Sequence, residues 1–321
     1  MSAAVTSSSS SSSAHSHMGR SRSPEDEKYY LRFDDDAKLR LSQQNRVTRE
    51  LMGGKFLSDK VVSHLQAISD SGRRPRICDI GTGPGDWMFD TQAQLRSLDI
   101  QAIFHGYDLF PIHFPSKGEQ ESKDVYFYKL NIHDKSTLPE LLVEKYDVVH
   151  VRYMSIVILG QQWEGAFGNC LGFLEPGGVM IWEEILFDEF EMSDRLEYPH
   201  AARIFDMGVA MFIRNGLLLN CSPKLTPLFE TNFQQSTQTK FSTTNLNEDW
   251  QRLQAKNMYM VTREMLMKKL EAGAKEEAAE ELGFGSADEA IETADLSMED
   301  YRKGCLTNMT ICQWIGEGFG G

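Results

Sequence analysis

Short apolar runs and helical stretches alternate along the middle of the chain. The apolar runs predict five strands, at residues 77–80, 102–107, 125–130, 146–151 and 179–185. Helical periodicity predicts helices at residues 86–98, 138–144 and 163–174, and Pro176-Gly177-Gly178 predicts a turn before the fifth strand. Strands that alternate with helices favour a parallel sheet covered on both faces.

The pattern changes on either side of this core, which spans residues 71–185. Residues 25–70 predict an N-terminal helical cap. Residues 186–321 predict lid helices and closing strands of the same domain, with helices at 198–219, 249–270 and 287–303 and strands at 233–243 and 307–315. The expected fold is therefore α/β, with a mostly parallel seven-stranded sheet. Residues 1–24 are serine-rich and carry no acid, which predicts a disordered tail.

Charge and composition narrow the classes of function. The net charge is −14, but residues 271–300 hold eleven acidic residues against one lysine, which predicts a solvated helical face there. Since no run of Lys and Arg is present, a nucleic-acid partner is disfavoured. No apolar run reaches the ~20 residues of a membrane helix, so no membrane partner is expected. The five scattered cysteines predict neither a disulfide framework nor a metal site and favour the cytoplasm, with the nucleus as the alternative.

The most informative segment runs from Ile77 to Trp87, where an apolar strand passes into a helix through Gly81, Gly83 and Gly85. Glycines allow a tight turn and let the backbone approach a ligand closely. Asp108 ends the next predicted strand, 23 residues after Gly85, close to the ~20-residue offset at which a carboxylate accepts the hydroxyls of a ribose. Together these features predict a nucleoside-binding site.

The nucleoside is either a dinucleotide or S-adenosylmethionine. The spacing G-x-G-x-G differs from the G-x-G-x-x-G of dinucleotide sites, and Asp79 precedes the first glycine on the strand itself. Its carboxylate would repel a pyrophosphate but attract a sulfonium and an ammonium group. The sequence therefore favours S-adenosylmethionine.

The same segments carry a family resemblance. The string DIGTGPGDWMFD, the GYDLFPIHFP that contains Asp108, the HVRY after the fourth strand and the upstream RLSQQNRVTRELMGGKFL resemble class I S-adenosylmethionine-dependent methyltransferases, and more narrowly the fungal LaeA-like methyltransferases of secondary metabolism. The resemblance implies a Rossmann-like class I methyltransferase fold with a helical lid inserted after the fifth strand. The family commonly has Gln-His where this chain has Gln44-Asn45, so a role for that histidine does not carry over.

The resemblance also implies roles for individual residues. The cofactor would be bound by the turn, by the ends of the second and third strands and by one tryptophan, namely Asp79, Gly81, Thr82, Gly83, Gly85, Trp87, Asp108, Leu109, Asn131 and Asp134. Trp87 either stacks on the cofactor or anchors its helix to the sheet. Arg152 and Tyr153 follow the fourth strand, where the family's transferred methyl group meets the acceptor.

A hydroxyl or thiol acceptor must also lose a proton, which a positioned base accelerates by roughly 10²–10⁴-fold. The candidate bases are His150, His113, Glu183 and Glu184. His150 alternates with valines and is equally readable as a core histidine. Glu183 and Glu184 lie on opposite faces of a strand end, so that at most one of them points into the site.

The lid carries methionines and aromatic residues at helical spacing. Phe205, Met211 and Phe212 are candidate walls of an apolar acceptor pocket, although the same spacing is typical of core packing.

Four functions remain open. The leading prediction is a methyltransferase that acts on the oxygen, nitrogen or sulfur of a small-molecule natural product. The others are a LaeA-like nuclear regulator that works through protein partners, an NAD-dependent dehydrogenase, and an enzyme that uses the cofactor without methylation. The sequence favours no particular oligomeric state.

Overall fold

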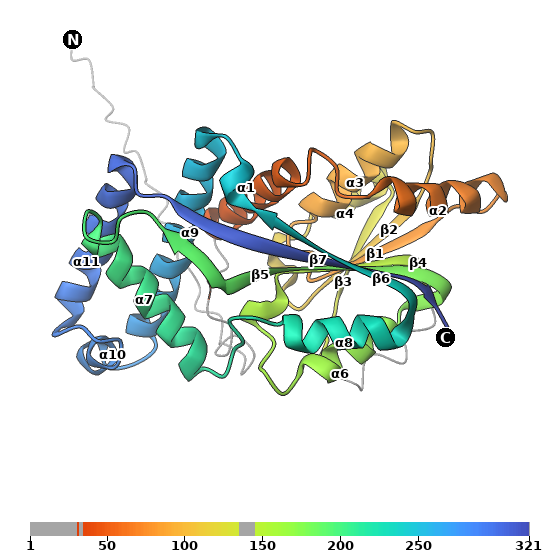
Figure 1. Ribbon diagram of the computed structural model, residues 1–321. Coiled ribbons are helices and arrows are strands. Elements are labelled where there is room, and N and C mark those ends of the chain that lie inside the picture. The colour runs from red at the N-terminus through yellow and green to blue at the C-terminus, as the bar shows by residue number, and fades with distance from the viewer. Residues whose placement is uncertain (1–30, 32–34, 135–144, 321) are drawn as a thin grey trace, which may run out of the picture.

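The computed structural model describes residues 31, 35–134 and 145–320. Its centre is a seven-stranded sheet with the strand order β3-β2-β1-β4-β5-β7-β6 (Figure 1). Strands β1 to β5 pair in parallel, and β7 pairs antiparallel with both β5 and β6. The expected mostly parallel, seven-stranded α/β sheet is confirmed.

The strands follow the predicted order along the chain. They are β1 Arg76–Ile80, β2 Ile103–Asp108, β3 Val125–Lys129, β4 Tyr146–Arg152, β5 Leu174–Met192, β6 Phe233–Ser242 and β7 Thr307–Phe319.

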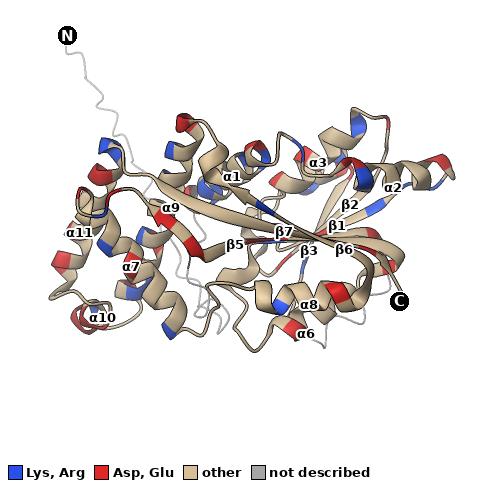
Figure 2. Ribbon diagram, in the orientation of Figure 1, with Lys and Arg blue, Asp and Glu red and all other residues tan. Residues whose placement is uncertain are grey.

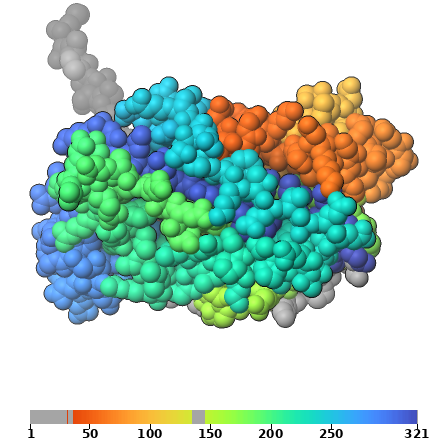
Figure 3. Space-filling view, viewed as in Figure 1, coloured from red at the N-terminus to blue at the C-terminus, as the bar shows by residue number. Residues whose placement is uncertain are grey.

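Helices cover both faces and one end of this sheet. They are α1 Asp35–Leu51, α2 Asp59–Asp70, α3 Asp86–Arg96, α4 Lys117–Lys123, α6 Trp163–Leu171, α7 Pro199–Arg214, α8 Ser222–Asn232, α9 Glu248–Glu271, α10 Lys275–Glu281 and α11 Ala287–Lys303. Figure 1 shows α1, α2 and α3 on one side of the sheet, α6 and α8 on the other, and α7, α10 and α11 gathered beyond the end of β5. In the space-filling view α8 and β6, in teal, form much of the visible face (Figure 3).

Three apolar clusters hold these layers together. One packs α2 and α3 on the sheet around Trp87, and a second packs α6 and α8 on the opposite face around Trp182. The third joins α7, α9, α10 and α11 to the far ends of β5 and β7 and includes Met258 and Ile311. The first two clusters lie on opposite faces because side chains alternate along each strand.

Strand β5 differs from the prediction. It begins at Leu174 and ends at Met192, so Pro176-Gly177-Gly178 lies inside the strand and not before it. The pairing with β4 shifts register between Tyr146 and Val148, opposite these residues. Gly177 has a φ of +83°, and the turn-forming residues are therefore accommodated as a bulge.

Other segments were not predicted or cannot be compared. Helices α4 and α8 have no counterpart among the predicted elements, whereas α10 lies in the acidic segment expected to form a solvated helical face. The expected tail at residues 1–24 and the expected helix at residues 138–144 lie outside the described residues. The domain boundaries drawn from the sequence stay predictions.

The acidic segment forms α10, α11 and their connection (Figure 2). Asp288, Glu292, Asp295 and Glu299 on α11 are exposed, as expected of a solvated face. Asp300 is the exception, because it is buried and accepts the backbone N–H groups of His200 and Ala201 at the start of α7. None of the described helices has the length and apolar character required to span a bilayer.

Candidate functional site

The glycine turn lies where the strand order reverses. Strand β1 has β2 on one side and β4 on the other, and in sheets of this kind ligands bind beyond the carboxyl ends of the strands at such a point. Gly81, Gly83 and Gly85 have φ values of +74°, +53° and +85°, in the region that disfavours residues with a Cβ. The N–H groups of Gly81 and Thr82 donate to Tyr107 O, at 2.8 and 3.0 Å, so the turn is bound to the end of β2.

Two apolar side chains lie over this turn. A Cβ placed on Gly81 would approach Met154 Sδ to 2.8 Å, and one placed on Gly83 would lie 3.6 Å from Leu41 Cδ1. Met154 follows β4, and Leu41 belongs to α1. A ligand that rests on the glycines therefore requires both side chains to move.

Asp108 faces the turn from the end of β2. Its Oδ2 accepts the N–H of Gly83 at 2.8 Å, and its Oδ1 accepts the N–H of Phe110 at 2.9 Å. Burial raises the pKa of Asp108 to about 6, although the N–H groups of Phe110 and Gly83 oppose that rise. Since an ionised carboxylate offers about four acceptor positions, Asp108 retains the capacity to accept both hydroxyls of a ribose.

The remaining predicted cofactor residues lie near the carboxyl ends of the same parallel strands. Leu130 N–H donates to Asp108 O at 2.8 Å, so Asn131, the next residue, lies at the end of β3 beside Asp108. Asp134 closes the turn that follows, because its N–H donates to Asn131 O at 3.0 Å. Leu109 is half-buried directly after Asp108. The Thr82 side chain is buried against the position where a Cβ on Gly106 would lie, and it therefore packs inward.

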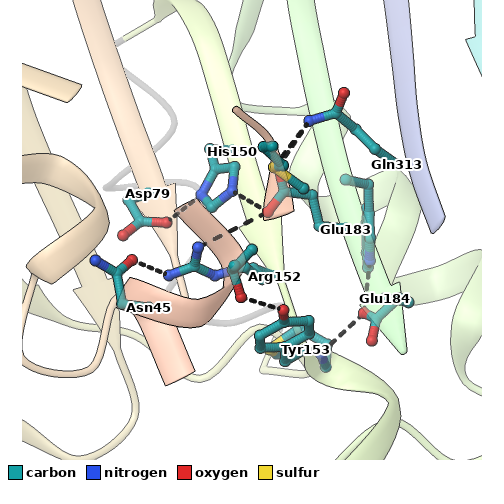
Figure 4. Close-up of polar contacts among 12 residues, drawn as sticks. Asn45, Asp79, His150, Arg152, Tyr153, Glu183, Glu184 and Gln313 are labelled. Atoms are coloured by element: carbon teal, nitrogen blue, oxygen red, sulfur yellow. Dashed lines mark hydrogen bonds and ion pairs between the residues drawn. The ribbon is translucent and has the colours of Figure 1, made fainter. Parts of the chain in front are cut away.

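A row of buried polar side chains crosses the sheet next to the turn (Figure 4). His150 Nδ1 lies 2.7 Å from Asp79 Oδ1, and His150 Nε2 lies 3.6 Å from Glu183 Oε2. Gln313 Nε2 donates to Glu183 Oε1 at 2.8 Å. The row thus joins β1, β4, β5 and β7, and all four side chains are less than a tenth exposed.

The charges in this row stabilise one another. Burial lowers the pKa of His150, but the carboxylates of Asp79 and Glu183 outweigh it and raise the pKa above its ordinary value. Burial likewise raises the pKa of Glu183, and its contact with His150, together with Arg152 and Gln313, lowers it overall. The contact between His150 and Glu183 thus favours the charged form of each side chain.

Trp87 is buried and packs against this row. Its ring stacks on His150 with centroids 3.7 Å apart and an interplanar angle of 0°, and Phe56 packs against it at 6.3 Å. Trp87 is 1% exposed. Of the two roles considered for Trp87, this geometry favours anchoring α3 to the sheet.

Arg152 connects the row to α1. Its Nη2 donates to Asn45 Oδ1 at 2.7 Å, and its Nη1 lies 3.8 Å from Glu183 Oε2. Asn45 in turn donates to Asp90 on α3 at 2.8 Å, and Ser42 donates to Asp86 at 2.6 Å. Helix α1 is thereby bound across the start of α3, over the glycine turn.

Tyr153 has an unusual backbone conformation, with a φ of +59°. Its hydroxyl lies 2.6 Å from Thr48 Oγ1 on α1, and burial raises the pKa of the phenol, which stays protonated at neutral pH. A non-glycine residue in this region is strained by about 1–3 kcal/mol, and such residues cluster at functional sites.

Glu184 supports that strained turn from the opposite face of β5. Its carboxylate accepts the N–H groups of Met154 at 2.8 Å and Ser155 at 3.0 Å and the indole N–H of Trp182 at 2.8 Å. Burial raises the pKa of Glu184 to about 7 even against these three bonds. Glu183 and Glu184 do face opposite sides, as predicted, but both lie within the strand and not at its end.

The predicted acceptor walls lie further along the lid. Phe205 and Phe212 line a cavity of about 20 Å³ between α7, α9 and β5, whereas Met211 is packed in the core of the third cluster. A cavity of this size holds no more than about one water molecule. His113 ends the short helix Pro111–His113 after β2, and in the same loop the N–H of Phe110 donates to Asp108.

Three residues with contacts in the site were not predicted from the sequence. Met154 over Gly81, Gln313 on Glu183 and Asn45 on Arg152 each depend on contacts between distant segments. The signal for Gln313 was available, because it is a polar residue between apolar neighbours in β7. No cluster of three or more metal-binding side chains occurs among residues 31, 35–134 and 145–320.

The chain shares part of its sequence or fold with several known proteins. The chain is 31% identical over 170 residues to Methyltransferase grgD of a Penicillium species, a match that takes in 51% of this chain. A putative sarcosine dimethylglycine methyltransferase from Galdieria sulphuraria has a TM-score of 0.42 at 12% identity, over 92% of this chain and 94% of its own. An O-methyltransferase family protein from Burkholderia thailandensis has a TM-score of 0.35 at 17% identity, over 54% of this chain and 52% of its own. No family model matches the sequence. The chain is thus similar over half its length to a curated methyltransferase, and the match spans 55% of that relative.

Proposed function

We propose that this protein is an S-adenosylmethionine-dependent methyltransferase that acts on the oxygen, nitrogen or sulfur of a small natural-product molecule. The observation that carries the proposal is the position of the Gly81–Gly85 turn at the reversal of strand order, with Asp108 facing it from the next strand. The similarity to the Penicillium methyltransferase supports the same reaction class. The narrower LaeA-like assignment stays part of the proposal.

The residues at the turn fit this cofactor in their chemistry. Space is open beside Gly83 as far as Leu41, Asp108 has spare acceptor capacity, and Asp79 supplies a carboxylate beside the turn. A bound S-adenosylmethionine would supply an electrophilic methyl group on a sulfonium. Asp108 would hold its ribose, and Asp79 would favour its positive charge.

The protein's own contribution is orientation. His150 has no exposed surface and is bonded to Asp79, so we assign it as a positioning residue that fixes the Asp79 carboxylate and not as the proton acceptor. Arg152 and Tyr153 lie at the end of β4 under α1, where they would orient the acceptor. Holding two reactants in near-attack geometry contributes ~7–11 kcal/mol at most.

Replacing Asp108 by alanine is expected to weaken S-adenosylmethionine binding by about 1–3 kcal/mol, or roughly 5- to 150-fold, because charge-assisted hydrogen bonds to the ribose are lost. Titration calorimetry measures this change. Asp124→Ala, which removes an exposed carboxylate paired with Arg74 before β3, is the matched control and should leave the affinity unchanged. Unchanged affinity in Asp108→Ala would contradict the ribose assignment.

The affinity should also depend on pH. Since burial raises the pKa of Asp108 to about 6, the carboxylate is ionised above that pH and accepts both ribose hydroxyls. Affinity is therefore expected to be constant above about pH 7 and to fall by up to about tenfold per pH unit below pH 6. Asp108→Asn should show a weaker affinity without this dependence, and an identical pH profile in the variant would rule out Asp108 as its source.

The reaction itself is tested with an extract of the source organism. The purified protein is incubated with S-adenosylmethionine labelled in the methyl group, and labelled small molecules are identified by mass spectrometry. A labelled product supports the proposal. Binding of the cofactor without any labelled product would favour the regulator, and tight binding of NAD without S-adenosylmethionine would favour the dehydrogenase.

A further inference from the structure

Strand β6 forms one open edge of the sheet. It has ten residues, and within the described part of the chain it pairs with β7 alone. Every residue from Gln234 to Lys240 is exposed, and β6 is part of the visible face of the molecule, with no helix across it there (Figure 3). The outward N–H and C=O groups of such a strand can pair with a further strand.

The opposite edge of the sheet is protected against such pairing. Strand β3 has only five residues and ends in Lys129. The N–H of Phe127 in this strand donates to Oε1 of Gln120 on α4 at 3.2 Å, so a side chain takes the position of a neighbouring strand. Short edge strands, lysines, prolines and bulges are the usual means by which proteins prevent pairing at an edge.

Strand β6 has few of these protections. Its register with β7 runs without a shift from Gln235 to Ser242, so this part contains no bulge. It contains no proline, and residues 234–239 are all glutamine, serine or threonine. Its one charged residue, Lys240, pairs with Glu189 on β5. A regular, neutral edge of this length is therefore a surface on which another strand can pair.

The composition of β6 favours a second copy of the chain as the partner. The net charge of −14 opposes the association of two copies in general, but β6 contributes no acidic residue to a contact. Since Lys240 is paired within its own chain, the strand has no free charge that would select an acidic peptide. Threonine and serine side chains form hydrogen bonds across antiparallel strands, and two copies of β6 offer these residue types to each other.

Symmetry limits the register of such a pair. Two identical antiparallel strands are related by a two-fold axis, so one residue lies opposite its own counterpart. Centring the pair on Thr237 uses residues 233–241, nearly the whole strand, and sets Ser236 opposite Gln238 and Gln234 opposite Lys240. The two lysines then do not face each other, and no like charges are brought together.

We propose that the protein forms a two-fold dimer in which β6 pairs antiparallel with β6 of a second copy, centred on Thr237. The two sheets would become one continuous sheet. Strands β4, β5 and β7 lie between β6 and the glycine turn after β1, so the interface does not include the candidate cofactor site. The dimer is therefore independent of the proposed methyltransferase function.

Light scattering after size-exclusion chromatography tests the dimer. At about 100 µM the wild type should have a mass twice the 36.5 kDa of the chain. Thr237→Lys and Thr237→Glu should each be monomeric, because two like charges would face each other at the centre of the pair. An equimolar mixture of the two variants should form a dimer again, since lysine then faces glutamate.

The control for these variants is Ser122→Lys, which adds the same charge at an exposed position on α4, near the opposite edge of the sheet, and should stay dimeric. Circular dichroism checks that each variant is folded. A monomeric wild type, a dimer in both Thr237 variants alone, or a mixture that stays monomeric would overturn the proposal.

A cysteine cross-link tests the register. The Cα atoms of opposite residues in antiparallel strands lie about 4.5–5.5 Å apart, within the range that a disulfide spans. Thr237→Cys should therefore form a disulfide-linked dimer when it is oxidised with diamide, seen on a non-reducing gel, whereas Ser122→Cys should not. The five native cysteines are buried and so give little background. Absence of the cross-link in a dimeric Thr237→Cys variant would overturn the pairing centred on Thr237.

Discussion

Replacing His150 by alanine is expected to lower the free energy of unfolding by about 3–5 kcal/mol. The imidazole lies between Asp79 and Glu183 and has no exposed surface, so its removal leaves two carboxylates buried with one partner fewer each. It also removes the surface on which Trp87 stacks. Chemical denaturation monitored by circular dichroism measures the change.

A matched variant separates this effect from simple loss of a buried ring. His105 on β2 is also buried, but its Nδ1 bonds the neutral hydroxyl of Tyr146. His105→Ala should therefore cost less than His150→Ala, about 1–3 kcal/mol. Equal losses in the two variants would show that the charges around His150 contribute nothing specific.

The contribution of His150 to the free energy of unfolding should depend on pH. Because the pKa of His150 is raised in the folded protein, its stabilising contribution is fully present below the ordinary histidine pKa and disappears as the pH rises through the raised value. The difference in stability between the wild type and His150→Ala should accordingly narrow in alkaline solution.

Gly83→Val is expected to abolish S-adenosylmethionine binding in a folded protein. A Cβ at Gly83 would meet only Leu41 at 3.6 Å, so the fold has room for it, whereas the branched side chain would occupy the space in which the ligand must lie. Calorimetry measures the binding, and circular dichroism checks the fold. Retained binding in a folded variant would rule out the turn as the cofactor site.

The control for Gly83→Val must carry the same backbone strain elsewhere. Gly177 in the bulge of β5 has a φ of +83°, and no atom lies within 4 Å of the position that its Cβ would take. It lies near the start of β5, which pairs with the start of β4, and therefore at the edge of the sheet opposite the glycine turn. Gly177→Val should lose stability but bind the cofactor normally. Loss of binding in both variants would indicate strain and not obstruction.

The glycine turn and its flanking strand and helix could be predicted because the residues that form them are adjacent in the sequence. The strand, the glycine turn and the start of α3 occur within residues 77–87, and the position of Asp108 follows from the length of one helix and one strand. Helix α8 was missed because Pro227 lies inside it, and α4 because its seven residues have no apolar periodicity.

The contacts within the site depend on how strands distant in the chain align, which local sequence patterns do not reveal. His150 and Glu183 were both named as candidates, but their meeting with Asp79 and Gln313 depends on how β1, β4, β5 and β7 are aligned. The same alignment changed the interpretation of His150, from a candidate base to a positioning residue that lies between two carboxylates.

Helix α1 is attached at once to α3, through Ser42 and Asn45, and to α9, through Arg40. In the proposed enzyme, this one helix would cover both the glycine turn, through Leu41, and the methyl-transfer position at the end of β4, through the contact of Thr48 with Tyr153. The demethylated cofactor and the methylated product would then both leave only after α1 has moved. The rate constant of this one movement is therefore expected to limit the release of both.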